Sequence, residues 1–151
     1  NLGAMYARGD GIPEDNKEAV KWWRKAAKQG NATSQFNLGV RYAFGKGVER
    51  DAKEAIRWYR KAAMQGHADA QNNLGLMYDN GEGVLEDDVT AYAWYNIAAA
   101  NEGVLAKKNK GILAKEMTPE QIAEAQRLSR ELLEHIAKKK APSNPEKSEG
   151  K

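Results

Sequence analysis

Few residues in this chain have the chemistry of a catalytic or metal site, and those present are far apart. The only histidines are His67 and His135, and there is no cysteine. Neither histidine has a His-x-x-x-His or Glu-x-x-His partner, so the supply of residues disfavours a metal site and a nucleophile–base pair. The lack of cysteine also removes thiolate nucleophiles and disulfides. We therefore expect no metal, no cofactor and no enzymatic activity.

Two short motifs resemble binding sites, and both have a simpler explanation. The Gly-x-Gly loops, such as Gly45 to Gly47, do not follow a strand and lack the third glycine of a dinucleotide-binding loop. Arg8-Gly9-Asp10 spells an integrin-recognition tripeptide, but Gly9 belongs to a repeated loop, so we interpret the match as coincidence. The paired carboxylates Asp87 and Asp88 are interpreted first as helix caps.

Composition and charge disfavour several classes of partner. The 151 residues are 41% hydrophobic and 30% charged, which is typical of one domain or a few stacked repeats. No apolar run approaches the roughly 20 residues that span a bilayer, so we expect no membrane insertion. Residues 138–151 hold five Lys and two Glu and account for the whole net charge of +3. The neutral remainder gives no reason to expect nucleic acid as a partner.

The elements that must position any site follow an internal repeat of 36 residues. Leu38-Gly39, Tyr42 and Trp58 each recur one interval earlier and one interval later, as do a Gly-x-Gly pair and a double alanine. A period of this length is typical of stacked supersecondary units rather than one closed globule. The architecture is therefore much better specified by the sequence than the identity of the partner.

Each unit predicts two amphipathic helices joined by the Gly-x-Gly loop. Small and apolar residues recur three and four positions apart in both halves of the unit. In the second unit we expect helices over residues 32–44 and 52–65, with Gly45 ending the first. Asp51 and Glu54 have the spacing of an N-cap and its reciprocal carboxylate.

Glycines inside the first helix of each unit predict close helix packing. Each of these glycines costs about 1 kcal/mol relative to alanine, so a compensating contact is expected. We expect the missing side chain to let the region around a tryptophan of the neighbouring helix approach. The glycines are Gly3, Gly39 and Gly75, and the tryptophans are Trp22, Trp58 and Trp94.

The repeat pattern decays after Ala100. A further helix is expected over residues 104–115, without a Gly-x-Gly loop after it. Thr118-Pro119 with Gln121 predicts a strong helix start, and the apolar stripe that follows predicts a C-terminal capping helix. We divide the chain into repeats at 1–102, of which the first is truncated at its N-terminus, a degenerate repeat and capping helix at 103–138, and a disordered tail at 139–151.

The repeated motif resembles the Sel-one-like repeats, which are relatives of the tetratricopeptide repeats. The first unit departs from that pattern at Ile12, which replaces a Val, and the third at Glu102, which replaces the closing Gly. The second unit matches it at Leu38, Gly39, Tyr42, Gly45, Gly47, Val48, Asp51, Ala55, Trp58, Ala62, Ala63 and Gly66.

The resemblance implies an all-α fold, a right-handed α/α solenoid of antiparallel helix pairs with about three 36-residue repeats and C-terminal capping helices. It also implies a scaffold or adaptor for other proteins. The last helix is similar to the ending of bacterial members, which favours a bacterial source.

In a chain similar to these relatives, the first helices of the units line a concave surface. Residues one helical turn apart that escape the packing pattern should face it. Several of them are apolar where the repeat does not require it, which favours a groove for a peptide or protein segment. The alternative, equally open, is that Phe36 and Phe44 complete the packing with neighbouring helices. The predicted binding residues are Thr33, Phe36, Val40, Phe44, Asp69, Asn72, Leu76, Asn80, Lys108 and Ile112.

The function hypothesis is a protein-protein interaction scaffold that binds a protein or peptide on its concave surface, and we expect a monomer. One alternative is a secreted or periplasmic cell-wall-associated protein, similar to relatives linked to peptidoglycan or β-lactam hydrolysis, although those relatives are cysteine-rich. Another is a purely structural spacer in a longer array. The compartment stays open between periplasmic or secreted and cytoplasmic.

Overall fold

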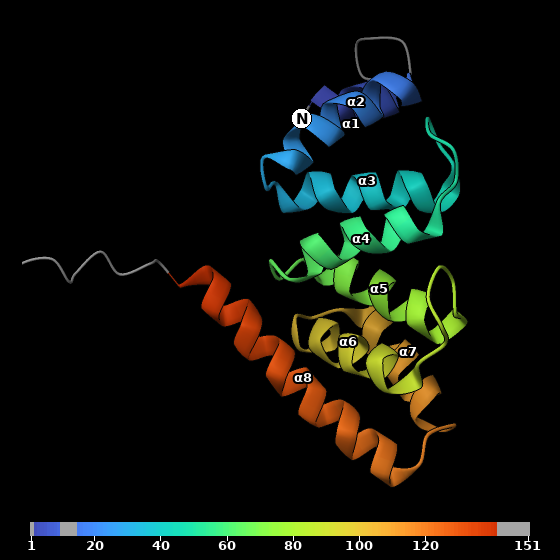
Figure 1. Cartoon of the computed structure of the whole chain (residues 1–151), viewed down its shortest axis with the longest axis vertical. Coiled ribbons are helices and arrows are strands. Elements are labelled where there is room, and N and C mark those ends of the chain that lie inside the picture. The colour runs from blue at the N-terminus through green and yellow to red at the C-terminus, as the bar shows by residue number, and fades with distance from the viewer. Residues whose placement is uncertain (1, 10–14, 142–151) are drawn as a thin grey trace, which may run out of the picture.

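The helices of this chain stack side by side along one axis (Figure 1). The structure is a computed structural model that describes residues 2–9 and 15–141. Within these residues it contains only helices and their connections, which confirms the predicted all-α class. The helices are α1 (Leu2–Arg8), α2 (Asn16–Lys28), α3 (Ala32–Phe44), α4 (Ala52–Ala63), α5 (Ala68–Asn80), α6 (Asp88–Ala100), α7 (Val104–Ala114) and α8 (Pro119–Lys140).

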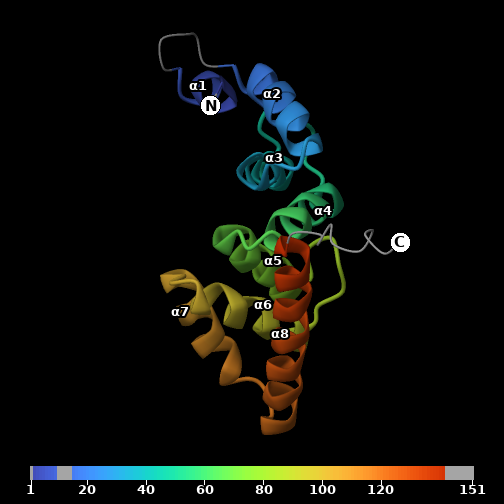
Figure 2. The ribbon, with the colours of Figure 1, turned by 90° about the vertical axis from the view of Figure 1, so that its left-hand side faces the viewer.

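The first and second helices of the units alternate along the stack. Figure 2 shows α1, α3, α5 and α7 on one side, which curves inwards, and α2, α4 and α6 on the other. The helices α3 and α5 pack most extensively on α4 and α6, their successors in the chain. The helix predicted over residues 32–44 is α3, and the one predicted over 52–65 is α4, which ends two residues earlier.

Aspartate caps begin the second helix of each unit, as predicted. The side chains of Asp51 and Asp87 accept hydrogen bonds from the backbone N–H three residues later, at 3.1 and 3.0 Å. The predicted reciprocal bond of Glu54 is replaced by an ion pair with Arg57 at 3.1 Å. Both side chains lie on the outer surface one turn apart, where a carboxylate and a cation meet easily. At the other end of the unit, Gly45 ends α3 in the left-handed conformation with φ 66°.

The helix-interior glycines each lie against an aromatic ring, but the ring is not the predicted one. A Cβ added to Gly39 would be 2.6 Å from Cδ1 of Tyr59, a distance too short for real atoms. The contact residue is the neighbour of Trp58 in α4, because one residue turns the helix by about 100°. The same offset holds in the other units, where Gly3 meets Trp23 and Gly75 meets Tyr95.

The repeated tryptophan instead connects a unit to the one before it. Trp58 packs with Val20 and Ala27 of α2 and with Leu38 of α3, and only 3% of its surface is exposed. It therefore contributes to the core between units, while the following residue contributes to the core within a unit.

Buried glutamines add a polar connection between units that the sequence analysis did not identify. The amide nitrogens of Gln35 and Gln71 donate to the carbonyls of Ala27 and Ala63, at 3.1 and 3.0 Å. Gln65 donates in turn to the Oε1 atom of Gln35 at 2.8 Å. These carbonyls lie in the last turns of α2 and α4, where a helix has no internal donor, and each also accepts the N–H of a glycine in the following turn. The available signal was the recurrence of Gln35 and Gln71 at the repeat interval.

Helix α8 begins at the predicted capping box and then turns back along the repeats. Thr118 and Gln121 exchange both bonds of the box, at 2.9 and 3.2 Å. The helix packs on α6, where Ser129 is buried and donates to the carbonyl of Ala125 at 2.8 Å. Further along, Ile136 joins the core of α4 and α5. The first half of α8 therefore packs on the core of the last helix pair, and its second half lies along the outer side of the array (Figure 2).

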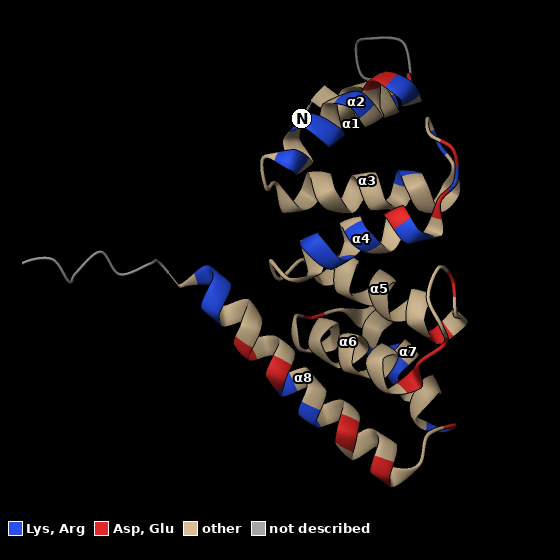
Figure 3. Cartoon of the chain, viewed as in Figure 1, with Lys and Arg blue, Asp and Glu red and all other residues tan. Residues whose placement is uncertain are grey.

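The acidic and basic residues of α8 are exposed and are distributed along its length (Figure 3). The helix continues to Lys140, two residues into the predicted tail. Residues 142–151 of that tail, Asp10 of the Arg-Gly-Asp tripeptide and Ile12 lie outside the described residues.

Candidate protein-binding surface

The structure divides the predicted binding residues into exposed and packed groups. Phe36, Val40 and Leu76 are half-buried, and Asn72 is buried. Thr33, Phe44, Asp69, Asn80, Lys108 and Ile112 are exposed. Only the exposed side chains and the accessible edges of the half-buried ones are available to a partner.

Phe36 completes helix packing. Its ring stacks on the imidazole of His67, with centroids 4.7 Å apart and planes tilted by 22°. It also lies 6.0 Å from the ring of Tyr59 and packs, together with Val40, against the core formed by α4 and α5. These contacts favour the packing interpretation for Phe36.

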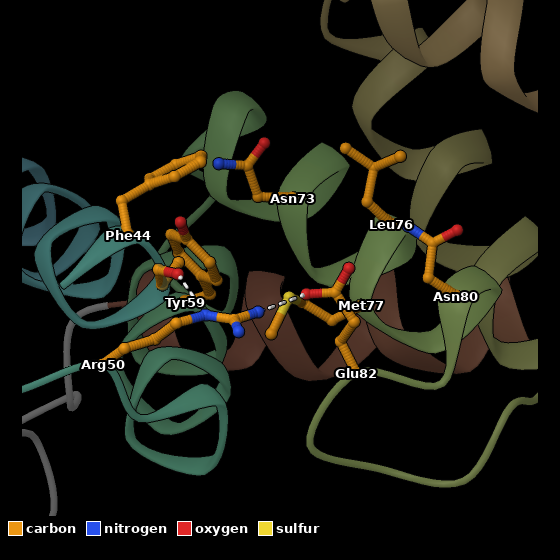
Figure 4. Close-up of a pocket in the computed structure, with 9 residues that line it drawn as sticks. Phe44, Arg50, Tyr59, Asn73, Leu76, Met77, Asn80 and Glu82 are labelled. Carbon is orange, nitrogen blue, oxygen red and sulfur yellow. Dashed lines mark hydrogen bonds and ion pairs between the residues drawn. The ribbon is translucent and has the colours of Figure 1, made fainter.

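Phe44 behaves differently, because 68% of its surface is exposed. It lies at the mouth of a pocket of about 400 Å³ between the ends of α3 and α5. Leu76 and Asn80 line the same pocket (Figure 4), so the structure brings three of the predicted residues together. Thr33, Asp69, Lys108 and Ile112 do not line it.

The floor of the pocket carries a tyrosine hydroxyl that the sequence analysis did not single out. Burial raises the pKa of Tyr59 to about 12, and a hydrogen bond with the side chain of Asn73 partly offsets this. The hydroxyl is therefore protonated at neutral pH and serves as a neutral hydrogen-bonding group. In the next unit the hydroxyl of Tyr95 donates to the carboxylate of Asp79 at 2.9 Å, and burial, together with this bond, raises the pKa of Tyr95.

An exposed ion pair closes one side of the pocket. The guanidinium of Arg50 lies 3.6 Å from the carboxylate of Glu82, and its Nε donates to the carbonyl of Ala43 at 3.1 Å (Figure 4). Both side chains are largely solvated, and pairs of this kind contribute only about 0–1 kcal/mol. Arg50 or Glu82 can therefore leave this ion pair and bind a ligand at little cost in stability.

Asn72 is engaged with the neighbouring helix. Its Oδ1 accepts a hydrogen bond from Asn109 of α7 at 3.1 Å. Lys108 and Ile112 are exposed on α7, on either side of Asn109 in the sequence. The signal for Asn73 and Asn109 was their recurrence at the repeat interval, together with Asn37.

The surface offers contacts but no reactive constellation. Among the described residues, no group of three or more His, Asp or Glu side chains is arranged to hold a metal ion. None of the described helices is both long and apolar enough to cross a membrane. The arrangement combines apolar contact from Phe44, Leu76 and Met77 with amide, hydroxyl and guanidinium hydrogen-bonding groups.

The fold defines a solenoid of helix pairs, and the sequence places it in a family. The pattern of the Sel1 repeat matches residues 1–31, 32–67 and 68–102, so the chain belongs to the Sel1 repeat family. Proteins of this family are generally non-enzymatic scaffolds for protein-protein interactions. No curated protein matches the sequence.

Several solved structures share the fold, including the two that follow. The crystal structure of c5321, described as a protective antigen of uropathogenic Escherichia coli strains with an SLR fold, is 40% identical with a TM-score of 0.84. That match covers 100% of this chain and 34% of the other, so this chain spans about a third of its length. A Sel1 repeat protein from Oxalobacter formigenes is 38% identical with a TM-score of 0.71, over 74% of this chain and 46% of the other.

Proposed function

We propose that this chain is a protein-interaction module that binds a peptide or protein segment on its concave side, with one side chain of the partner in the pocket beside Phe44. The observation that carries the proposal is the exposure of Phe44 at the mouth of that pocket. An exposed aromatic ring next to a concave apolar site is the usual composition of an energetic centre in a protein interface.

The chemistry of the pocket suggests what it accepts. Leu76 and Met77 provide an apolar wall, and about 400 Å³ is enough for one large apolar side chain. The amides of Asn73 and Asn80 and the guanidinium of Arg50 surround this wall and match the hydrogen-bonding groups of a peptide backbone. The proposed partner segment therefore carries an exposed apolar residue within a polar stretch.

The experiment is an affinity capture with two matched variants. The original chain, Phe44→Glu and Leu85→Glu serve as three baits. Leu85 is the control position, because it is 90% exposed and does not line the pocket. A bacterial lysate is suitable because both similar structures come from bacteria. The proposal predicts a protein retained by the original chain and by Leu85→Glu and lost by Phe44→Glu, when all three melt alike.

Other outcomes assign a different function. A partner retained by Phe44→Glu places binding outside the pocket, and capture of nothing by any bait favours the spacer alternative. Phe36→Glu is unsuitable as the test variant, because the stacking of Phe36 on His67 predicts a loss of stability.

A further inference from the structure

A second surface, on the outer side of the molecule, gathers positive charge. A groove of about 440 Å³ runs along α4 and reaches the last turn of α8. Its polar lining consists entirely of cations, namely Lys53, Arg57, Arg60, Lys61 and Lys139. We call it the basic groove. It shares no lining residue with the pocket beside Phe44, and the helices that form it, α4 and α8, lie on the side away from α3 and α5 (Figure 2).

The three lysines of the groove have no carboxylate partner among the described residues. Arg57 pairs with Glu54, and Arg60 donates to the hydroxyl of Tyr78. Among the described residues, no carboxylate lies within ion-pair distance of the ammonium groups of Lys53, Lys61 or Lys139. Like charges held together repel one another, so an anion in the groove is favoured electrostatically.

The fold itself creates this concentration of charge. Lys139 is distant from α4 in sequence and reaches it because α8 turns back along the array. The neighbouring Lys140 also touches the turn after α4, where its Nζ lies beside Gly66. Figure 3 shows basic residues along α4 and in the last turn of α8, and residues of both line the groove. The sequence analysis assigned Lys139 to a disordered tail, whereas the structure places it beside the cations of α4.

Apolar residues form the rest of the groove and restrict the kind of anion. Ile56, Met64 and Val84 line it between the cations. The cations of α4 extend from Lys53 to Lys61, which corresponds to about 12 Å along a helix. A short acidic peptide with one apolar side chain matches this combination. Nucleic acid would require a longer basic stripe or exposed aromatic rings, and Trp58 beneath the groove is only 3% exposed.

We propose that the basic groove binds an acidic protein segment, through its carboxylates on the cations and an apolar side chain against Ile56, Met64 and Val84. Carboxylates pair well with guanidinium and ammonium groups at such sites. With the concave surface on the other side, the chain would hold two protein segments at once.

The test uses a fluorescent synthetic peptide in which one leucine is flanked on both sides by glutamates, and measures binding by anisotropy. The variant is Lys53→Gln/Lys139→Gln, which removes two cations that hold no ion pair. Its matched control is Lys17→Gln/Lys28→Gln, which removes the same charge from exposed positions on α2. The groove variant should weaken binding by roughly tenfold, and the control should leave it unchanged. Added salt should weaken binding of the wild-type chain.

Several results would overturn the proposal. If the peptide does not bind at millimolar concentration, or if a peptide with glutamines in place of the glutamates binds equally well, the groove does not recognise an acidic segment by its charge. Tighter binding of a DNA duplex through the same lysines assigns the surface to nucleic acid. Self-association of the wild-type chain that the groove variant abolishes assigns it to a second copy.

Discussion

The ring of Tyr59 lies so close to the backbone of Gly39 that a Cβ there would be 2.7 Å from Cε1. This contact sets the distance between α3 and α4, and it also positions the hydroxyl of Tyr59 at the floor of the pocket beside Phe44. Packing within the repeat and the geometry of the proposed binding site are therefore determined by the same pair of residues.

The first prediction concerns this pair. Gly39→Ala should lower the free energy of unfolding by about 1–3 kcal/mol, because the added methyl group overpacks a buried aromatic contact. Gly111→Ala is the matched control, since a Cβ there meets nothing within 4 Å and Gly111 lies inside α7. The control should gain about 0.5–1 kcal/mol from the better helix propensity. Urea denaturation of both variants measures the difference, and equal effects at the two sites would contradict the contact.

A second prediction concerns the buried glutamines. Gln71→Ala removes the hydrogen bonds of a buried side chain with the carbonyl of Ala63 and the amide of Asn101. At about 0.5–1.5 kcal/mol for each bond, it should destabilise the fold by about 1–3 kcal/mol. Gln126→Ala, at an exposed position of α8, should change stability by less than about 0.5 kcal/mol. Thermal or urea unfolding compares them. If both variants unfold alike, Gln71 does not hold the units together.

A third prediction concerns pH. Burial lowers the pKa of His67, and the nearby carboxylate of Asp69 partly offsets this. The neutral imidazole caps α5, because its Nδ1 accepts the backbone N–H of Ala70 at 3.3 Å. A lowered folded pKa means that the unfolded chain binds the proton more tightly. The contribution of His67 is therefore complete above its unfolded pKa of about 6.5 and is lost as the pH falls towards the folded pKa.

His67→Asn tests the pH effect without removing the cap. Asn31 occupies the equivalent position before α3 and accepts the N–H of Ser34 at 2.8 Å, so asparagine suits this site. The free energy of unfolding is measured from about pH 7.5 to about pH 5. The original chain should lose more stability than His67→Asn across this interval. Parallel curves would show that His67 does not titrate with folding.

A fourth prediction concerns α8. Ile136 is 6% exposed and packs on α4 and α5, whereas Leu133 on the same helix is 42% exposed. Ile136→Ala should therefore cost about 2–4 kcal/mol and Leu133→Ala less than about 1 kcal/mol. Similar losses for the two variants, measured by denaturation, would mean that α8 does not pack along the repeats as described.

The sequence predicted the local structure well because its signals are local. The periodicity of apolar residues, Asp51 as an N-cap and Gly45 as a C-terminal glycine located α3 and α4 to within two residues. The error at Gly39, where Tyr59 and not Trp58 makes the contact, has a physical cause. Two adjacent aromatic residues of one helix face directions about 100° apart, and the repeat pattern alone does not say which direction faces which neighbour.

The site was less predictable because it depends on several elements at once. Phe44, Leu76 and Asn80 were expected on the concave side, but Tyr59 and Asn73 entered the pocket through packing between units. The basic groove depends on the path of α8, which brings Lys139 to α4. No local pattern in the sequence specifies that path.

The most direct test of the central claim is site-specific photo-crosslinking at the pocket. A photoreactive phenylalanine analogue replaces Phe44 in one preparation and Leu85 in another, and each is irradiated in a bacterial lysate. Because Phe44 lies at the mouth of the pocket, the proposal predicts a covalent adduct with a partner protein from position 44 and none from position 85. An adduct from position 85 alone, or no adduct from position 44, would contradict it.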